Sequence, residues 1–255
     1  MMITSVRRNT VLLCGLGAIG YLLFASLLIP ASWALNRFTL PTGMSFYGVE
    51  GTVWQGRIKT LRWRDEAVRN IRWSFRWRAL LQGGVAVELH ADDPGVLTGR
   101  TVLTYGSTWS ISETYMRFPA ARINRYIQST FPVSTGGDID IAIEKFSFTP
   151  SSCLSLNGRA EWQKSVLSSS LGQANLGTTT MQLSCANNKV NIAIGQTAPQ
   201  INSRSQLLVD MQGRYHFQGE LTPGELFPPA LNQLLKASTR ETGNGVYTIM
   251  TAGHF

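Results

Sequence analysis

Hydrophobic and polar side chains alternate with a period of two residues along much of this chain. In residues 71–78 the odd positions carry Ile71, Trp73, Phe75 and Trp77, while every even position carries serine or arginine. Similar alternation recurs in residues 85–89, 138–144, 207–211 and 215–217. A period of two places the apolar side chains on one face of a strand, so these segments predict half-buried β-strands.

Short turn-forming segments separate the predicted strands. They lie at residues 83–84, 93–95, 136–137, 187–188 and 243–245, which favours antiparallel hairpins. Two other stretches, 119–129 and 224–238, place apolar residues at helical spacing near prolines and predict short helices. Residues 163–177 are small and polar without a regular pattern, which predicts a loop or a hairpin tip.

One N-terminal stretch is continuously apolar. Residues 11–29 form a run of about 19 apolar positions, enough to cross a bilayer. The predicted anchor residues are Val11, Leu12, Leu13, Leu22, Leu23, Leu27, Leu28 and Ile29. Arg7 and Arg8 precede the run and only Arg37 follows closely, so the positive-inside rule predicts a cytoplasmic N-terminus. A cleaved signal peptide is the alternative, although its apolar core usually spans only about 7–15 residues.

The sequence therefore predicts three parts along the chain. Residues 1–9 form a cytoplasmic tip, residues 10–33 a transmembrane anchor, and residues 34–255 a β-rich domain outside the cytoplasm. The fold class is mostly β: one N-terminal transmembrane helix, then an antiparallel curved sheet, sandwich or open groove with two short helices. The sequences RWSF at 72–75 and KFSF at 145–148 suggest an internal duplication with halves at 45–135 and 136–255, unless the match is chance.

The cysteines fit this topology. Cys14 lies in the predicted anchor, which leaves Cys153 and Cys185 as the pair outside the cytoplasm. Paired thiols in an oxidising compartment form disulfides, so we expect these two to be bonded. The alternative is two free buried cysteines.

Charge is unevenly distributed. The net charge is +8, and a dense basic cluster interleaved with tryptophans occupies residues 54–78. Alternation places the candidate contact face, Arg72, Arg76 and Arg78, opposite Trp73 and Trp77. A nucleic-acid groove would need cations and aromatics on one surface, so attraction to anionic lipid headgroups or an acidic partner is favoured. A merely solvated face is the plain alternative.

The sequence offers little chemistry for catalysis. It has three histidines and three cysteines, none grouped at ligand spacing, so neither a metal site nor another cofactor is expected. A nucleophile elbow and a phosphate-binding loop are also missing from the part beyond the anchor. We therefore expect no enzymatic activity. The apolar strand faces are expected either to close a core or to line a groove for a hydrophobic ligand.

Several ordered motifs resemble the type II secretion system protein N family. They are GTVWQG at 51–56, the block 73–89 with LLQG at 80–83, Cys153 followed by GRAEW at 158–162 and Cys185, and GRYHF at 213–217 followed by LTP at 221–223. The structural motif residues are Gly51, Trp54, Gly56, Trp73, Trp77, Gly158 and Trp162. Gln55 and Arg57 depart from the small, less charged residues that the family pattern suggests.

The resemblance implies a bitopic inner-membrane protein of Gram-negative bacteria, with its C-terminal domain in the periplasm. Its implied role is that of an accessory subunit contacting other inner-membrane proteins of the secretion machine, with no catalytic residues. It also implies a disulfide between Cys153 and Cys185. The rival hypothesis is a membrane-tethered β-groove module that binds lipid or another hydrophobic ligand.

Overall fold

The computed structural model describes residues 15–18, 20–22, 24–35, 37, 43–64, 66–125, 134–243 and 245–254. These residues fall into two compact units, residues 1–75 and residues 76–255. Both units consist mainly of antiparallel strands, which confirms the predicted mostly β fold. The predicted repeat halves at 45–135 and 136–255 stay a prediction.

Unit 1 contains a three-stranded meander. Residues 15–18, 20–22 and 24–27 are helical, and a short helix α2 (Ala31–Leu35) follows them. Strands β1 (Met44–Gly51), β2 (Gln55–Trp63) and β3 (Glu66–Phe75) pair in sequence order. The register places Gly56 of β2 opposite Trp73 of β3.

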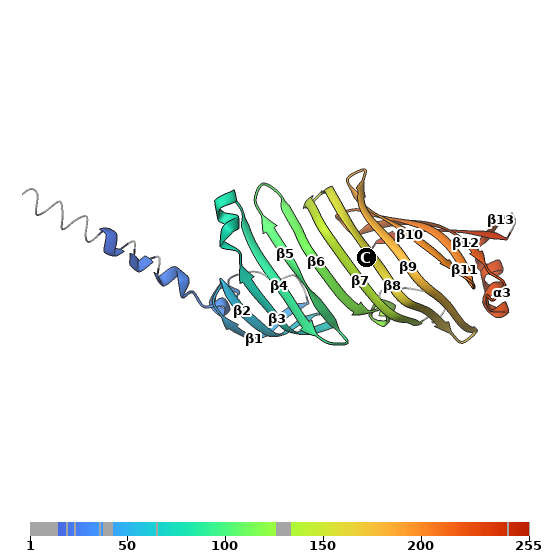
Figure 1. The fold of residues 1–255 in the computed structure, drawn as a ribbon, viewed down its shortest axis with the longest axis horizontal. Coiled ribbons are helices and arrows are strands. Elements are labelled where there is room, and N and C mark those ends of the chain that lie inside the picture. Colours follow the sequence, from blue (N-terminus) through green and yellow to red (C-terminus); the bar gives the residue numbers. More distant parts are fainter. Residues whose placement is uncertain are drawn as a thin grey trace, which may run out of the picture. The chain divides into compact units, whose positions relative to one another are not determined.

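Unit 2 is also a meander of antiparallel strands, and several of its strands are longer than those of unit 1 (Figure 1). Neighbouring strands pair antiparallel in sequence order from β4 to β12, and β14 then lies between β12 and β13. Its strands are β4 (Val85–Asp93), β5 (Leu97–Tyr105), β6 (Trp109–Pro119), β7 (Ser134–Thr149), β8 (Ser152–Ser169), β9 (Gly172–Ala186), β10 (Lys189–Ala198), β11 (Ile201–Val209), β12 (Arg214–Pro223), β13 (Arg240–Gly243) and β14 (Val246–His254). Its helical elements are η1 (Trp77–Gln82), η2 (Ala120–Arg125) and α3 (Pro229–Ser238).

Bulges interrupt the longest strands of unit 2. The β7–β8 register shifts between Gly136 and Asp138, and the β8–β9 register shifts between Trp162 and Ser165. Gly137 and Lys164 have positive φ angles of 92° and 50° at these places. Bulges bend a strand and increase its twist. They therefore curve the sheet without ending its strands.

A small core cluster lies in unit 2. Ala174, Leu176 and Ile201 are buried, and Trp162 and Phe227 are among the residues packed against them. Ala174 and Leu176 lie on β9 and Ile201 on β11. The core thus joins strands that are not neighbours in the sheet.

Two local predictions were wrong, and a third is confirmed only at a hairpin tip. The strand predicted through residue 78 ends at Phe75, and Trp77 begins η1, which closes at Gly83 in the left-handed region with a φ of 76°. The turn predicted at 136–137 is a bulge inside β7. Residues 163–169 and 172–177 belong to β8 and β9, so only the hairpin tip between them is a turn. Alternation identifies a face, but it does not mark where a strand ends or bulges.

The predicted helices are present in shorter form. α3 occupies Pro229–Ser238 within the predicted 224–238, because residues 224–227 form a turn in which Phe227 N–H donates to Gly224 O at 3.1 Å. The described part of the first predicted helix is the 3₁₀ helix η2, Ala120–Arg125. Residues 126–129 of that prediction lie outside the described residues.

Candidate functional site

The turn between β1 and β2 is held by a compact hydrogen-bond pattern. Gly51 has a φ of 98°, and a side-chain Cβ at this position would overlap the backbone oxygen of Gln55. The Thr52 hydroxyl accepts hydrogen bonds from the backbone N–H groups of Trp54 and Gln55 at 3.3 and 3.4 Å. Gly51 is therefore required by the turn geometry.

Gly56 makes room for the indole ring of Trp73. A Cβ on Gly56 would overlap the six-membered part of that ring and the backbone oxygen of Glu50. Trp73 Nε1 also donates a hydrogen bond to the backbone oxygen of Val53 at 3.3 Å. The indole thus lies across β2 and ties β3 to the turn.

Trp54 fastens the N-terminal segment to this turn. Its Nε1 donates to the backbone oxygen of Ser26 at 2.9 Å, and its ring meets Phe75 edge-on with a centroid distance of 5.0 Å. The backbone N–H of Val53 donates to Ile29 O at 3.1 Å, one residue before a β-bridge between Pro30 and Thr52. We call the contact of Ser26 and Ile29 with the turn residues 51–56 the Trp54 junction.

The segment held by this junction exposes large apolar side chains. Tyr21, Leu22 and Phe24 are 72%, 65% and 63% exposed. Leu16, Leu27, Leu28 and Trp33 are exposed too. Within the described residues, no helix has the length and apolarity needed to cross a membrane. Arg7, Arg8, Val11, Leu12, Leu13 and Leu23 lie outside the described residues.

A row of charged residues crosses the three strands of unit 1. The register aligns Glu50 with Arg57 and Arg57 with Arg72. Glu50 forms ion pairs with Lys59 at 2.6 Å and with Arg57 at 2.7 Å. Hydrogen bonds from Lys59 and Arg57 lower the pKa of Glu50 from 4.5 to about 2. One carboxylate therefore faces several cations in this row.

Arg76 is engaged by two carboxylates of unit 2. It forms a bidentate pair with Glu113 at 2.7 and 2.9 Å and a 3.0 Å bond to Glu88. The hydrogen bond to Arg76 is the main cause of the lowered pKa of each glutamate. Arg78 lies in η1, and Arg72 lies on β3 of unit 1. The charge of Arg76 is thus balanced within unit 2.

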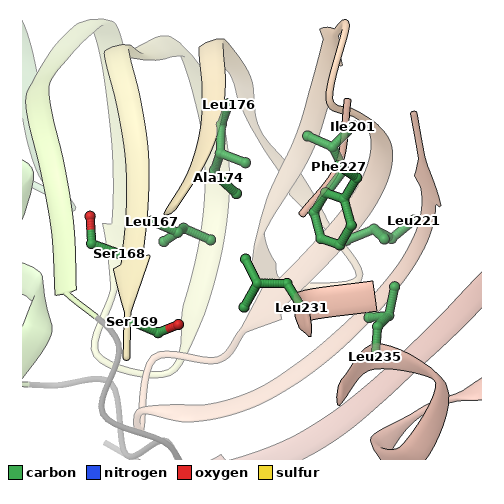
Figure 2. Close-up of a pocket in the computed structure, with 10 residues that line it drawn as sticks. All are labelled: Leu167, Ser168, Ser169, Ala174, Leu176, Ile201, Leu221, Phe227, Leu231 and Leu235. Atoms are coloured by element: carbon green, nitrogen blue, oxygen red, sulfur yellow. The ribbon is translucent and has the colours of Figure 1, made fainter. Parts of the chain in front are cut away.

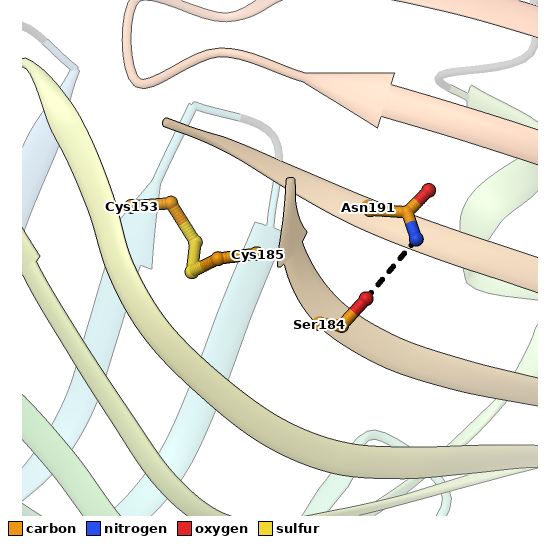
Figure 3. Close-up of a disulfide and its surroundings, with 4 residues drawn as sticks. All are labelled: Cys153, Ser184, Cys185 and Asn191. Carbon is orange, nitrogen blue, oxygen red and sulfur yellow. Dashed lines mark hydrogen bonds between the residues drawn. A yellow bond between two sulfur atoms is a disulfide. The ribbon is translucent and has the colours of Figure 1, made fainter. Parts of the chain in front are cut away.

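The predicted disulfide is present in unit 2 (Figure 3). It joins Cys153 near the start of β8 to Cys185 near the end of β9, with 5.7 Å between the Cα atoms. Beside it, Asn191 Nδ2 donates to the Ser184 hydroxyl at 3.0 Å. The bond therefore closes the open end of the β8–β9 hairpin.

Gly158 and Trp162 are placed by the same sheet. Gly158 is paired with Ile143 on one side and Leu183 on the other, and a Cβ on it would lie 3.1 Å from Ala142 O. Trp162 Nε1 donates to Gly136 O at 2.8 Å, beside the bulge of β7. Gly158 thus allows close approach of β7, and Trp162 packs against the core cluster.

An apolar cavity of about 200 Å³ lies beneath α3 (Figure 2). Its lining residues come from β8, β9, β11, β12, α3 and the connection before α3. They are Leu167, Ser168, Ser169, Ala174, Leu176, Ile201, Leu221, Phe227, Leu231 and Leu235. The loop prediction for 163–177 concealed this site. The available signal was the two-residue spacing of Ala174 and Leu176 within a stretch of small polar residues.

The described residues place no group of three or more His, Cys, Asp or Glu side chains where it could hold a metal ion.

Comparison with known proteins identifies the family. The model of the family type II secretion system (T2SS), protein N, matches residues 42–250. This chain belongs to that family. Membership implies a role in the type II secretion machinery and partners among its other components. The match includes the turn residues 51–56 but neither Ser26 nor Ile29, and it includes the strands that carry the disulfide and all the cavity-lining residues named above.

Curated relatives cover most of the chain. The type II secretion system protein N of Vibrio cholerae is 27% identical over 247 residues, spanning 92% of this chain and 98% of the relative. That of Klebsiella pneumoniae is 28% identical over 221 residues, spanning 86% of each. That of Aeromonas hydrophila is 23% identical over 249 residues, spanning 96% of this chain and 99% of the relative. No solved structure matches this chain.

Proposed function

We propose that this chain is a non-enzymatic accessory subunit of the type II secretion machine, anchored in the inner membrane. In this proposal residues 1–9 lie in the cytoplasm, residues 10–33 cross the membrane, and residues 34–255 occupy the periplasm. The supporting observation is the Trp54 junction, because it fastens the C-terminal end of the proposed span to the first strands of the β-rich part. In this proposal the turn 51–56 therefore lies at the periplasmic surface of the inner membrane.

The junction explains how anchoring would affect partner binding. A domain fastened close to its anchor is confined to a thin layer above the membrane, which raises its local concentration beside other membrane-bound proteins. A flexible connection would relax that restraint. The hydrogen bonds at Trp54 and Val53 favour a short and defined connection.

The first contact surface in this proposal is the outer edge of β1. Within unit 1, β1 stands at the end of the strand order and pairs with β2. An extended segment of another protein can add to such an edge through backbone hydrogen bonds. Tyr47 on β1 is 57% exposed and offers an aromatic contact beside the edge.

The second contact surface is the basic row of unit 1. Residues 43–75 contain six lysines and arginines and three acidic residues. Anionic lipid headgroups attract such clusters when they lie close to a membrane. We propose that Arg57, Lys59 and Arg72 orient unit 1 toward the inner-membrane surface. Arg78 of unit 2 remains a candidate for contact with an acidic partner, whereas Arg76 is already held by Glu88 and Glu113.

An anchor exchange tests the proposal. One variant replaces residues 1–36 with a cleavable signal peptide, and a second replaces residues 1–24 with an unrelated single-pass anchor and keeps Ser26. Both are expressed in cells that lack the native chain. We expect secretion to fall with the soluble form and to recover with the foreign anchor. Secretion at the wild-type level from the soluble form would contradict anchoring.

A further inference from the structure

The cavity beneath α3 has the composition of a site for an aliphatic chain. Apart from Phe227, its apolar lining side chains are leucine, isoleucine and alanine. Among the described residues that line it, none is charged. The cavity is partly open to solvent, and a concave, mostly apolar recess of about 200 Å³ has the character of a ligand site.

We infer that this cavity binds the end of one linear acyl chain, with α3 as its cover. The volume exceeds that of a cavity of about 150 Å³ that holds a benzene ring, and it is below the usual 300 Å³ or more of drug-sized pockets. It therefore suits one narrow hydrocarbon tail and excludes a whole phospholipid or a bulky ring system. The headgroup of a phospholipid whose tail is bound stays outside the cavity.

The lining has a polar side as well as an apolar one. Ser168 and Ser169 follow Leu167 at the end of β8, and Figure 2 shows Ser169 on the same side of the strand as Leu167. The Ser169 hydroxyl already donates to Gly172 O and accepts from the backbone N–H of Leu171. In this inference the polar group of the acyl chain emerges at the hairpin tip, which is the polar side of the lining.

Helix α3 is seated mainly by apolar contacts. Leu231 and Leu235, one helical turn apart, both face the cavity. The helix begins after Pro228 without a side-chain cap, and the buried Oδ1 of Asn232 has no hydrogen-bond partner among the described residues. A buried amide oxygen without a partner weakens the seating of the helix. In this inference α3 moves outward to admit an acyl chain, at a small cost in free energy.

The inference goes beyond the proposed function and stands on unit 2 alone. It needs neither the Trp54 junction nor a secretion partner. The anchor bears only on the source of the acyl chain, because a membrane-bound domain meets phospholipids while a free domain meets fatty acids. The test below therefore separates acyl binding from its source and from secretion.

Fluorescence quenching provides a direct test. Trp162 packs against the core cluster that forms the cavity wall, so a bromine atom on a bound acyl chain would quench its fluorescence. The full chain is reconstituted in phosphatidylcholine vesicles, and decanoate with a terminal bromine is added. The difference in quenching between the wild type and Trp162→Phe measures the quenching of Trp162, which is the part that arises at the cavity.

Cavity-filling variants link that signal to the site. Ala174 is buried on β9 and lines the cavity, so Ala174→Leu should fill it and weaken decanoate binding at least tenfold. Leu235→Phe fills the cavity from α3, and it is the second cavity-filling variant to use if Ala174→Leu fails to fold. The matched control is Leu226→Ala, because Leu226 precedes the lining residue Phe227 but is itself 66% exposed.

The source of the chain is decided by a second set of vesicles, in which the phospholipid chains carry the bromine. Quenching of Trp162 by either free decanoate or brominated phospholipid, lost on filling the cavity, supports the inference and names the source. Absence of Trp162 quenching from both sources would overturn it. Equal quenching in wild type and in a folded cavity-filling variant would overturn it as well.

Discussion

Trp54 donates its indole N–H to the backbone oxygen of Ser26 at 2.9 Å, across 28 positions of sequence. The same tryptophan meets Phe75 at the end of β3. A single side chain therefore contacts the N-terminal segment, the β1–β2 turn and the third strand. This explains why a tryptophan, which combines a large ring with a donor, occupies the middle of the turn.

The Trp54→Phe variant tests the junction. Phenylalanine keeps the aromatic contact with Phe75 and removes the hydrogen bond to Ser26, which should cost about 1 kcal/mol. We expect faster amide hydrogen exchange at residues 26–29 and easier proteolysis between residues 24 and 43. Trp63→Phe is the matched control, because Trp63 lies in the same unit and is 51% exposed. Unchanged exchange in Trp54→Phe would show that the hydrogen bond does not hold the segment.

The Gly56→Ala variant tests the packing of Trp73. The added methyl group would overlap the indole of Trp73 and the backbone of β1, so we expect a loss of about 1–3 kcal/mol in unfolding free energy. Urea unfolding measures the change. Gly195→Ala on β10 is the control, because its Cβ would meet its nearest neighbour at an ordinary 3.6 Å. Equal effects at the two sites would contradict the proposed role of Gly56.

The disulfide makes a third prediction. Cys153 and Cys185 are 32 positions apart, and closing a loop of that size stabilises the native state by about 3–4 kcal/mol in the chain-entropy model. Replacing both with alanine should lower the urea midpoint by a corresponding amount. Reducing agent should lower the wild-type midpoint and leave the double variant unchanged. A reductant effect of equal size in both proteins would contradict the assignment.

Arg76 makes a prediction about acid stability. Arg76 lowers the pKa of Glu88 below 4.5 in the native state. At pH values between this lowered pKa and 4.5, the native state therefore binds fewer protons than the unfolded state. The stabilisation is full above pH 4.5 and is lost as pH falls through the lowered pKa of Glu88. The difference in unfolding free energy between wild type and Arg76→Gln should therefore be largest near neutral pH and shrink in acid.

Arg78→Gln is the control for that experiment, because Arg78 lies in the adjacent η1. Urea unfolding at a series of pH values between neutral and acid measures both variants. We expect Arg78→Gln to show a difference from wild type that is small and independent of pH. A difference for Arg76→Gln that grows as pH falls would contradict the ion-pair assignment.

The sequence predicted the strands better than their interruptions. Alternation located β3 at Trp73 and Phe75, because the two faces of a strand differ in burial. It missed the end of that strand, since Trp77 continues the alternation inside η1. It also missed the strands at 163–177, where small residues on a closely packed sheet remove the contrast between the faces.

The site was predictable in part. The two cysteines and the motif residues Gly51, Trp54 and Gly56 were identifiable in the sequence, yet the contact between Trp54 and Ser26 was not. That contact joins a turn to a distant backbone carbonyl. Every residue has a backbone carbonyl, so the sequence does not indicate which one accepts the hydrogen bond. The cavity was also hidden, because it depends on how a curved sheet brings β8 and β9 toward β11, β12 and α3 (Figure 2).

The account as a whole rests on contact between the β-rich part and other machine components. Photo-crosslinking in living cells from Tyr47 on β1 tests this most directly, with Tyr105 in unit 2 as a second site that is 51% exposed. We predict adducts from Tyr47 to another protein of the type II secretion machine, lost in cells without that machine. Cells that secrete normally but give no such adduct from either site would contradict the account.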